Sequence, residues 1–373
     1  MLWHRPDIGM NEQKVDIKTP TLLVDERKVR HNLRTMLAKA RHNGSSLRPH
    51  FKTHQSATVA QWIRDEGIDK ATVSSVGMAK YFADAGWEDL LIAFPYNPLE
   101  YEEMTELANK CKLSVTIVSK EALDHLNAHV DAELDYYIKV DVGTHRTGIS
   151  STDVELINHL ATSANPKHRL KGILAHAGHT YKPLDAHAAR VMFDHAIEQL
   201  MEVKQAIGQE ELIISYGDTP SCSLLDEFPG IDELRPGNFV FYDVMQHYFG
   251  SCTLAEIAVC MVCPVVAIHP ERCEVVVYGG GVHFAKESIS ELGENVFGKV
   301  VALSGRSWDS FPLARVDRLS QEHGIIKASE EFVQALKIGD LVGILPVHSC
   351  LTADIQPHYQ ALDGTIIEKW NKS

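Results

Sequence analysis

The 373-residue sequence lacks the features that mark membrane proteins and nucleic-acid-binding proteins. No apolar run is long enough to span a bilayer, and the first residues show no charged head followed by an apolar core, so we expect neither a transmembrane helix nor a signal peptide. Basic runs and stripes are also absent, and 50 acidic against 36 basic residues give a formal net charge of −14. Nucleic acid and anionic membranes are therefore not expected as partners.

Cysteine is scarce and odd in number. Seven cysteines are scattered along the chain without a secretion signal, a pattern that predicts free thiols in a reducing, cytoplasmic compartment. Cys260 and Cys263 have the spacing of a metal knuckle. They lie in a strand pattern at 258–266, however, which would direct the two sulfur atoms to opposite faces, so we interpret both as structural.

The apolar pattern predicts two domains. From residue 47 onward about eight β-then-α units follow one another over roughly 200 residues, as in a (β/α)8 barrel. The strand-like runs are 47–53, 71–76, 89–95, 113–118, 135–142, 170–177, 211–217 and 235–242, and the helical stretches include 98–110, 120–129, 151–163 and 184–207. After Asp243 runs rich in β-branched residues predominate, and only 329–337 looks clearly helical. We therefore predict an α/β protein with a TIM-like (β/α)8 barrel at 26–245 and a second, mainly β domain.

The segment 48–54, RPHFKTH, carries an unusual concentration of basic residues. Read as a strand, it places Leu47, Pro49 and Phe51 on one face and Arg48, His50, Lys52 and His54 on the other. Burial disfavours the ammonium form of a lysine, and neighbouring cations act in the same direction. A neutral Lys52 amine would be a nucleophile suited to form a Schiff base with an aldehyde cofactor. Alternatively, the strand lies at a rim and the lysine extends its ammonium group into water.

Polar, glycine-containing clusters follow four later strands, at 141–148, 176–181, 215–221 and 235–238. In a barrel of this type the functional residues lie at the carboxyl ends of the strands, so these clusters and Lys52 predict a site on one rim. The last two clusters have the features of a phosphate site. Gly217 and Gly237 allow backbone N–H groups to approach an anion, and Thr219 and Ser221 add hydroxyl donors. A helix starting at Pro220 would add its dipole, although the same glycines are also typical of tight turns.

A candidate metal pair lies near the end of the chain. His348 and Cys350 are two residues apart, so on a strand they would share a face and could bind one soft-to-borderline divalent ion. Two protein ligands leave positions open, which suits a catalytic metal rather than a structural one. Chance occurrence is the alternative for a motif this short.

Taken together, these motifs resemble the fold-type III pyridoxal phosphate enzymes with an alanine-racemase-like barrel, specifically the D-serine dehydratase and D-threonine aldolase family. The resemblance extends from about residue 19 to the end of the chain. It rests on RPHFKTH at 48–54, DVG at 141–143 with Arg146 and Gly148, GHTY at 178–181, RPG at 235–237, LSQEHG at 319–324 and HSC at 348–350. Met78 follows Val76-Gly77 where the family often has an acid, and Gln321 stands where a second acid is expected, so substrate specificity is not transferred.

The resemblance implies roles for individual residues. Lys52 would carry pyridoxal 5'-phosphate, Arg146 would lie near its phenolic oxygen, and Tyr181, rather than Arg235, would partner its pyridine nitrogen. The implied cofactor-binding set is Lys52, His50, Arg146, Tyr181, Gly217, Thr219, Arg235, Gly237 and Asn238. The implied catalytic set is Lys52, His179 and Tyr181, with His176 and His323 as further candidates for substrate or metal contacts.

The resemblance also has implications for the whole chain. It places the strand at 21–25 in the β domain, which then comprises 1–25 and 246–373. It further implies a head-to-tail homodimer with active sites at the boundary between the barrel and the β domain.

The expected reaction is β-elimination from a D-3-hydroxy amino acid, D-serine being the simplest. Lys52 would remove the α-proton, and a metal at His348 and Cys350 would assist departure of the hydroxyl group. Thiolate plus imidazole favours Zn2+, with Mn2+ as the alternative.

Three other readings are weighed against this one. Retro-aldol cleavage of a D-threonine-like substrate is the main alternative, although the aldolases of the family tend to place a carboxylate where Cys350 stands. Racemisation requires a second acid/base opposite Lys52, which the sequence does not identify. A non-catalytic pyridoxal phosphate carrier would resemble the barrel alone.

Overall fold

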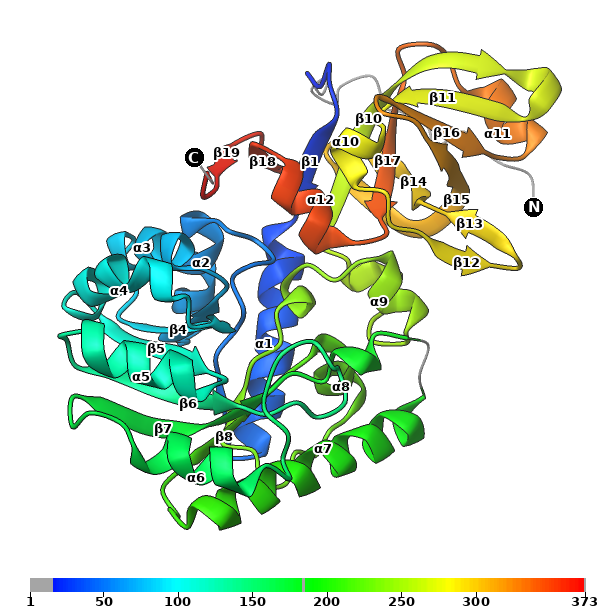
Figure 1. Cartoon of the computed structure of the whole chain (residues 1–373). Helices are drawn as coiled ribbons and strands as arrows, with labels where there is room; N and C mark the ends of the chain where they lie inside the picture. The colour runs from blue at the N-terminus through cyan, green and yellow to red at the C-terminus, as the bar shows by residue number, and fades with distance from the viewer. Residues whose placement is uncertain (1–15, 183–184, 372–373) are drawn as a thin grey trace. The chain divides into compact units, whose positions relative to one another are not determined.

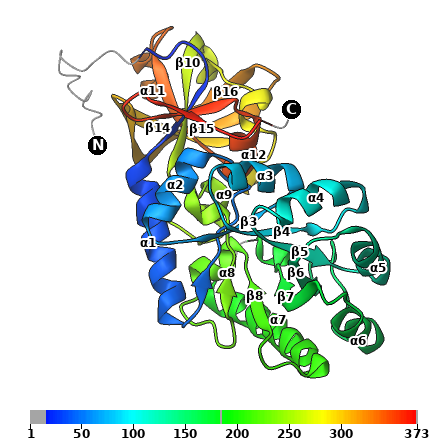
Figure 2. The same cartoon turned by 90° about the vertical axis from the view of Figure 1, so that its left-hand side faces the viewer.

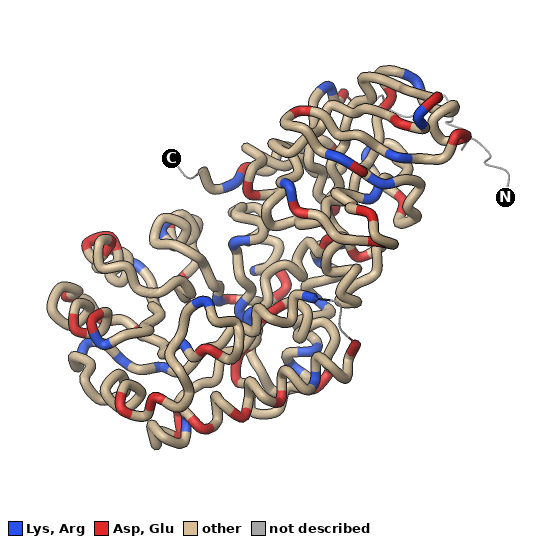
Figure 3. The backbone as a smooth tube through the Cα atoms, turned by 45° about the vertical axis from the view of Figure 1, so that its right-hand side comes forward, with Lys and Arg blue, Asp and Glu red and all other residues tan. Residues whose placement is uncertain are grey.

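The computed structural model describes residues 16–182 and 185–371, which divide into two compact units. The barrel unit comprises 27–182, 185–242, 246–256 and 368–371, and the β unit comprises 16–26, 243–245 and 257–367. Residues 1–15, which we predicted to belong with the β domain, lie outside the described residues. No helix in the described part of the chain is long and apolar enough to cross a membrane. Basic and acidic residues are interspersed along the backbone of both units (Figure 3).

Eight parallel strands form the barrel, in the order β2-β9-β8-β7-β6-β5-β4-β3. Their bounds are β2 Ser46–Leu47, β3 Lys70–Val73, β4 Asp89–Pro95, β5 Lys112–Ile117, β6 Leu134–Lys139, β7 His168–Ala175, β8 Ile213–Tyr216 and β9 Glu233–Leu234. An isolated bridge between His50 and Thr72 links the two ends of this order, so the ring of strands is nearly closed. The predicted (β/α)8 barrel is confirmed.

Helices cover the outside of these strands, and Figures 1 and 2 show α3 to α7 along their outer side. The helices are α1 Glu26–His42, α2 Ala57–Asp65, α3 Val76–Asp84, α4 Tyr101–Ala108, α5 Lys120–His129, α6 Val154–Thr162, α7 Ala186–Ile207, α8 Thr219–Leu224 and α9 Val244–Tyr248, with the 3-10 turns η1 Pro98–Glu100, η2 Gly178–Thr180, η3 Asn238–Val240 and η4 Leu254–Glu256. Ser56, Ser75 and Ser119 precede α2, α3 and α5, and each hydroxyl accepts a hydrogen bond from a backbone N–H of the first turn. These serine caps fix where the strand-to-helix loops end.

The barrel interior is packed rather than hollow. All six residues of β6 are buried, as expected for a parallel strand covered on both faces. Leu91, Tyr137 and Leu174, from three different strands, form one buried cluster. Tyr137 therefore points into the barrel, and the alternation along β6 directs Lys139 to the same side.

The β unit contains a nine-stranded sheet in the order β11-β16-β15-β14-β17-β10-β1-β18-β19, in which β11 also pairs with β10 and closes a ring of six strands. The bounds are β1 Thr21–Val24, β10 Val259–His269, β11 Glu274–Tyr278, β14 Gly298–Ser304, β15 Ser307–Leu319, β16 His323–Lys327, β17 Leu341–Pro346, β18 His358–Ala361 and β19 Ile366–Glu368. A hairpin of β12 Ile289–Glu291 and β13 Glu294–Val296, the turn η5 Pro270–Arg272, and the helices α10 Gly281–Phe284, α11 Glu330–Ala335 and α12 Ser349–Ile355 complete it. The predicted helix at 329–337 is confirmed by α11, whereas α10 and α12 were not predicted.

Two of the predicted strands are wrong in extent. The strand predicted at 47–53 ends at Leu47, and residues 51–54 form a turn. The strand predicted at 235–242 is wrong in position, because β9 ends at Leu234 and the turn η3 occupies Asn238–Val240. In both cases a proline, Pro49 or Pro236, stands two residues after the last residue of the strand. Proline has no N–H to donate to the hydrogen-bond ladder, so the strand does not continue.

Candidate active site

Lys52 lies in the turn that follows β2, at the carboxyl end of the barrel strands. The backbone before it still runs alongside β9, because Arg48 N–H donates to the Leu234 carbonyl at 2.8 Å and His50 N–H donates to the Pro236 carbonyl at 3.0 Å. The Lys52 side chain is half-buried, and its backbone N–H donates to His50 Nδ1 at 3.3 Å. The turn therefore brings the lysine and His50 together at the barrel mouth.

The prediction that all four basic residues of segment 48–54 share one face is wrong. Arg48 is fully buried inside the barrel, where its Nε is 2.7 Å from Glu233 Oε2 and its Nη1 is 2.7 Å from Asp89 Oδ1. His54 is also fully buried, with its ring centroid 4.6 Å from that of Phe51. The turn at 51–54 breaks the strand alternation, so Arg48 and His54 serve packing rather than the site.

The loops after β8 and β9 pack too closely for side chains. A Cβ atom on Gly217 would lie 2.6 Å from the backbone carbon of Arg235, and one on Gly237 would lie 3.0 Å from His50 Cβ and from the His50 carbonyl oxygen. Thr219 is fully buried, and its hydroxyl has no hydrogen-bond partner among the described residues. The two glycines are required by this close packing of the loops, and the buried hydroxyl without a partner fits an oxygen of a cofactor phosphate at this position. Asn238 is buried beside them at the start of η3.

Arg235 is held rigidly below these loops. Its Nε donates to Ser215 Oγ at 2.6 Å, and its Nη2 donates to the carbonyls of Ala175 and Ser215 at 2.6 and 3.1 Å. Ser215 Oγ in turn donates to Glu233 Oε1 at 2.7 Å. The guanidinium group is thus fixed by β7 and β8, with most of its donors already used.

Two histidines at the site are neutral. His176 Nδ1 is 2.7 Å from the carbonyl oxygen of Gly217, which places the ring proton on Nδ1 and leaves Nε2 as an acceptor. Burial lowers the pKa of His176 to about 3, and the positive charge of Lys52 acts in the same direction. Burial, then Lys52 and Arg235, also lower the pKa of His50 well below its usual range. Neither imidazole therefore adds positive charge near Lys52.

The cluster after β7 places His179 and Tyr181 on the same rim. His179 is half-buried, its Nδ1 has no partner among the described residues, and its Cε1 lies 3.3 Å from where a Cβ on Gly143 would be. The Tyr181 hydroxyl accepts a hydrogen bond from Thr219 N–H at 3.4 Å. Buried Asp218 accepts hydrogen bonds from Thr180 Oγ1 at 2.8 Å and from Ser221 N–H at 2.7 Å, so it connects this turn to the start of α8.

Arg146 lies in the loop after β6 and is exposed, and a second lysine lies close by. Lys139, which the sequence analysis did not select, is the last residue of β6 and is only 6% exposed. Burial lowers the pKa of Lys139 to about 8, and the positive charges of Arg146, Arg235 and Lys52 act in the same direction. The signal in the sequence was the position of Lys139 two residues after Tyr137 in the predicted strand, which places both side chains on the same face.

The candidate metal pair occupies a different local structure from the one predicted. β17 ends at Pro346, His348 is the N-cap of α12 and Cys350 lies in the first turn of that helix, so the two residues do not share a strand. They nevertheless meet, because the His348 ring is hydrogen-bonded to Cys350 and, through Nδ1, to Glu287. Burial opposes a charge on His348, but the bonds to Cys350 and Glu287 outweigh it and raise the pKa of His348 to about 11.

Carboxylates surround this pair. Glu287 contacts Nδ1 of His348, which leaves Nε2 for a metal ion, as is usual for metal-binding histidines. Asp243 accepts hydrogen bonds from the backbone N–H and the hydroxyl of Ser349 at 2.9 and 3.1 Å and so holds the start of α12. No group of three or more His, Cys, Asp or Glu residues arranged for a metal ion occurs within the described ranges. A thiolate and an imidazole fit a borderline divalent ion that keeps open positions.

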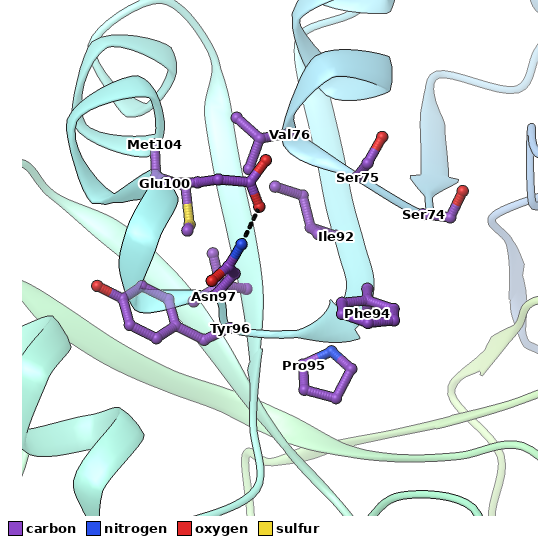
Figure 4. Close-up of a pocket in the computed structure, with 11 residues that line it drawn as sticks. Ser74, Ser75, Val76, Ile92, Phe94, Pro95, Tyr96, Asn97, Glu100 and Met104 are labelled. Atoms are coloured by element: carbon purple, nitrogen blue, oxygen red, sulfur yellow. Dashed lines mark hydrogen bonds between the residues drawn. The ribbon is translucent and has the colours of Figure 1, made fainter. Parts of the chain in front are cut away.

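A separate cavity of about 220 Å3 lies on the helix side of the barrel strands (Figure 4). Ile92 and Phe94 from β4, Val115 from β5 and Met104 from α4 line it, and Asn97 donates a hydrogen bond to Glu100 at its edge at 2.8 Å. None of the predicted site residues lines this cavity. It therefore lies apart from the loops described above.

A nearly closed barrel with a lysine and glycine-bounded loops at one rim, followed by a separate β unit, defines the alanine-racemase-like fold. Comparison with protein families agrees. The alanine racemase N-terminal domain model matches residues 24–244, and the putative serine dehydratase domain model matches residues 258–362. The chain belongs to this fold-type III family of pyridoxal phosphate enzymes, as the resemblance implied.

Several relatives match over almost their whole length. D-serine dehydratase of Dictyostelium discoideum is 30% identical over 395 residues, covering 95% of this chain and 96% of the relative. D-threo-3-hydroxyaspartate dehydratase of a Delftia strain is 26% identical, covering 97% and 99%, and D-threonine aldolase of an Arthrobacter species is 25% identical, covering 94% and 89%.

Solved structures show the same fold. The Delftia D-threo-3-hydroxyaspartate dehydratase superposes with a TM-score of 0.89 at 24% identity, covering 97% of this chain and 100% of that one. A cysteine-to-alanine variant of that enzyme, in a metal-free form, superposes with a TM-score of 0.88 at 25% identity, covering 97% and 100%.

Proposed function

We propose that the chain is a pyridoxal phosphate-dependent, divalent-metal-assisted lyase that dehydrates D-3-hydroxy amino acids such as D-serine to a keto acid and ammonia. The observation that carries the proposal is the convergence of Lys52, the Gly217 and Gly237 loops and buried Thr219 on one barrel rim. Relatives that act as D-serine and D-threo-3-hydroxyaspartate dehydratases support the substrate class.

The residues of the rim have distinct roles in this proposal. Lys52 would hold the cofactor covalently and, when its amine is free, would take the α-proton of the substrate on its Nζ. When bound, pyridoxal phosphate supplies the electron sink for the α-carbon. Gly217, Gly237, Thr219 and Asn238 hold its phosphate group.

The other side chains of the rim orient the ring and the substrate. Arg146 would hold the phenolic oxygen of the cofactor, and His50 would complete the binding set. Tyr181, rather than Arg235, would partner the pyridine nitrogen, because Arg235 keeps its donors on Ser215 and Ala175. His179 would contact the substrate, a role supported by its Nδ1, which is buried without a partner among the residues that the structure describes.

We further propose that His348 and Cys350 hold a divalent ion, zinc by preference. Such an ion would supply a Lewis acid for the departing hydroxyl group. The pairing of a soft thiolate with an imidazole and the orientation of His348 by Glu287 support zinc over Mn2+. The metal-free form of the Delftia enzyme variant, in which a cysteine is replaced, is consistent with a cysteine ligand.

Retro-aldol cleavage to glycine and an aldehyde is the second candidate, because D-threonine aldolase and 3-hydroxy-D-aspartate aldolase are also relatives. The presence of Cys350 in place of a carboxylate favours dehydration. Racemisation and simple cofactor binding are less well supported, since the relatives that match along the full chain are lyases.

A product assay decides between these reactions. Purified enzyme is incubated with D-serine, D-threonine and D-3-hydroxyaspartate, with and without a chelator, and keto acid, ammonia and glycine are measured. We expect keto acid and ammonia, with the rate lost on chelation and restored by Zn2+. Glycine as the main product would favour the aldolase candidate, and neither product from any substrate would remove both.

We also propose a cytoplasmic head-to-tail homodimer without nucleic-acid or membrane partners. The dimer is what the resemblance to the family implies. The seven free cysteines support a reducing, cytoplasmic compartment. The acidic composition supports the absence of nucleic-acid and membrane partners.

A further inference from the structure

Lys139 is a buried cation that the proposed reaction does not yet use. It is the last residue of β6, and the strand alternation places its side chain on the same face as Tyr137, which packs against Leu91 and Leu174 inside the barrel. With 6% of its surface exposed, the side chain lies in the mouth of the barrel rather than on its outer wall. The carboxyl end of an inward-facing strand is where this fold places functional groups.

The strand order places Lys139 across the barrel from Lys52. Going round the ring from β2, β6 is reached after β9, β8 and β7 in one direction and after β3, β4 and β5 in the other. β6 is therefore diametrically opposite the strand that leads into the Lys52 turn. A ligand joined to Lys52 and lying across the mouth would extend towards Lys139.

The charge around Lys139 is not balanced by the protein. Its ammonium group makes no hydrogen bond or ion pair to any residue in the described part of the chain, and three of the charges that act on it are the cations Arg146, Arg235 and Lys52. The acid that acts on it is Asp141, whose carboxylate already accepts hydrogen bonds from the backbone N–H groups of Gly143 and His145, both at 3.0 Å.

Other groups in the mouth do not compensate. His50 and His176 have strongly lowered pKa values because they are buried, and so remain neutral. Lys139 is therefore a buried cation without a bonded acid among the described residues, and such a cation is costly unless an anion binds to it.

Lys171 provides the contrast. This lysine is also partly buried, on the neighbouring strand β7, but its Nζ is 3.2 Å from Asp135 Oδ2. The charge of Lys171 is therefore matched by an acid of the protein, whereas Lys139 has no such ion pair among the described residues.

We propose that Lys139 is a cofactor-binding residue whose ammonium group pairs with the phenolic oxygen of pyridoxal phosphate, together with Arg146. The inference rests on the proposed function. Pyridoxal phosphate carries two anionic groups, and the loops around Gly217 and Gly237 account for the phosphate. The phenolic oxygen can then pair with Lys139 at the end of β6 and with Arg146 in the loop after it.

The test uses full-length enzyme freed of cofactor, with the variants Lys139→Met, Lys139→Arg and, as a matched control, Lys171→Met. Pyridoxal phosphate is titrated into each protein and followed by visible absorbance and calorimetry. We expect Lys139→Met to raise the Kd of pyridoxal phosphate about tenfold or more, as loss of a charged hydrogen bond does, with Lys139→Arg and Lys171→Met close to wild type.

A spectroscopic readout separates binding from general stability. Removing a cation beside the phenolic oxygen favours the protonated form of the bound cofactor, so the pH at which its visible spectrum changes should rise in Lys139→Met and stay unchanged in Lys171→Met. If Lys139→Met does not fold, the Kd and the pH of the spectral change are compared between Lys139→Gln and Lys139→Arg instead.

Two failures are distinguishable. Wild-type enzyme that shows no covalent attachment of pyridoxal phosphate overturns the proposed function and this inference with it. Attachment in wild type with equal Kd values and spectra in Lys139→Met, or equal losses in Lys139→Met and Lys171→Met, overturns the role of Lys139 alone.

Discussion

Arg48 and Lys52 show how position in the fold separates two cations that are close in sequence. Arg48 is fully buried and neutralised by Glu233 and Asp89, so it contributes to the barrel core. Lys52 is half-buried in a turn at the barrel mouth, beside neutral His50. The chemistry assigned to the site therefore depends on a single amine.

Replacement of that amine gives the first residue-scale prediction. Lys52→Ala should abolish the visible absorbance of covalently held pyridoxal phosphate and lower keto-acid formation by about 10²–10⁴-fold or more, because the proton acceptor is lost. Absorbance spectra and a product assay measure both effects. Lys80→Ala, at an exposed position on α3, is the control and should keep both. Retention of the spectrum in Lys52→Ala would place the attachment elsewhere.

The second residue-scale prediction concerns the metal pair. Cys350→Ala should leave the purified protein without stoichiometric zinc, measured by elemental analysis. Glu287→Gln should keep both ligands but lower zinc affinity by about 10–100-fold, the usual effect of removing a carboxylate that orients a histidine. Cys273→Ala, in the same unit, should bind zinc normally. Full zinc content in Cys350→Ala would contradict the assignment.

At the scale of elements, a buried ionic network joins the shortest strands of the barrel. β2 and β9 have two residues each, yet Arg48 after β2 bonds to Glu233 on β9, which accepts from Ser215 on β8. Burial by itself would raise the pKa of Glu233, but Arg48 and the hydrogen bond from Ser215 lower it below its ordinary value of 4.5. The network therefore connects β2, β8 and β9, of which β2 and β9 have few backbone hydrogen bonds to their neighbours.

Breaking this network should destabilise the barrel in a pH-dependent way. Glu233→Gln should lower the free energy of unfolding at neutral pH by about 3–5 kcal/mol, because it leaves Arg48 with one partner fewer. The pKa of Glu233 is lowered on folding, so its stabilising contribution is present above pH 4.5 and is lost as the pH falls through the lowered value. The difference between wild type and variant should therefore shrink in acid.

Urea unfolding at several pH values measures this difference. Asp131→Asn is the matched control, because Asp131 forms an exposed ion pair with Lys167 and its replacement should leave the free energy of unfolding almost unchanged. A Glu233→Gln variant as stable as wild type at neutral pH would show that the network does not hold these strands.

At the scale of the whole molecule, the proposed assembly is a homodimer. A homodimer should sediment with twice the 41.6 kDa mass of the chain at micromolar concentration. Sedimentation velocity over a dilution series measures this mass. A monomer at all concentrations would remove the dimer from the proposal.

The repeated alternation of strands and helices was sufficient to predict the barrel. The strand predicted at 89–95 and the helix predicted at 120–129 have the observed bounds, because apolar period and serine caps are local signals. The strand ends around Pro49 and Pro236 and the helix at Ser349 were missed. The two prolines were local signals for the strand ends, whereas the start of the helix at Ser349 depends on Asp243, a partner distant in sequence.

The sequence by itself determined the kinds of chemistry available: a lysine in a basic segment, glycine-rich strand ends and a histidine–cysteine pair. Only the tertiary structure decided which of these groups meet and in what state of charge. It turned Arg48 inward to a buried acid, brought His348 to Cys350 at a helix start rather than on a strand, and placed Lys139 opposite Lys52. The physical reason is that charge and reactivity depend on burial and on neighbours from other strands, which spacing along the chain does not encode.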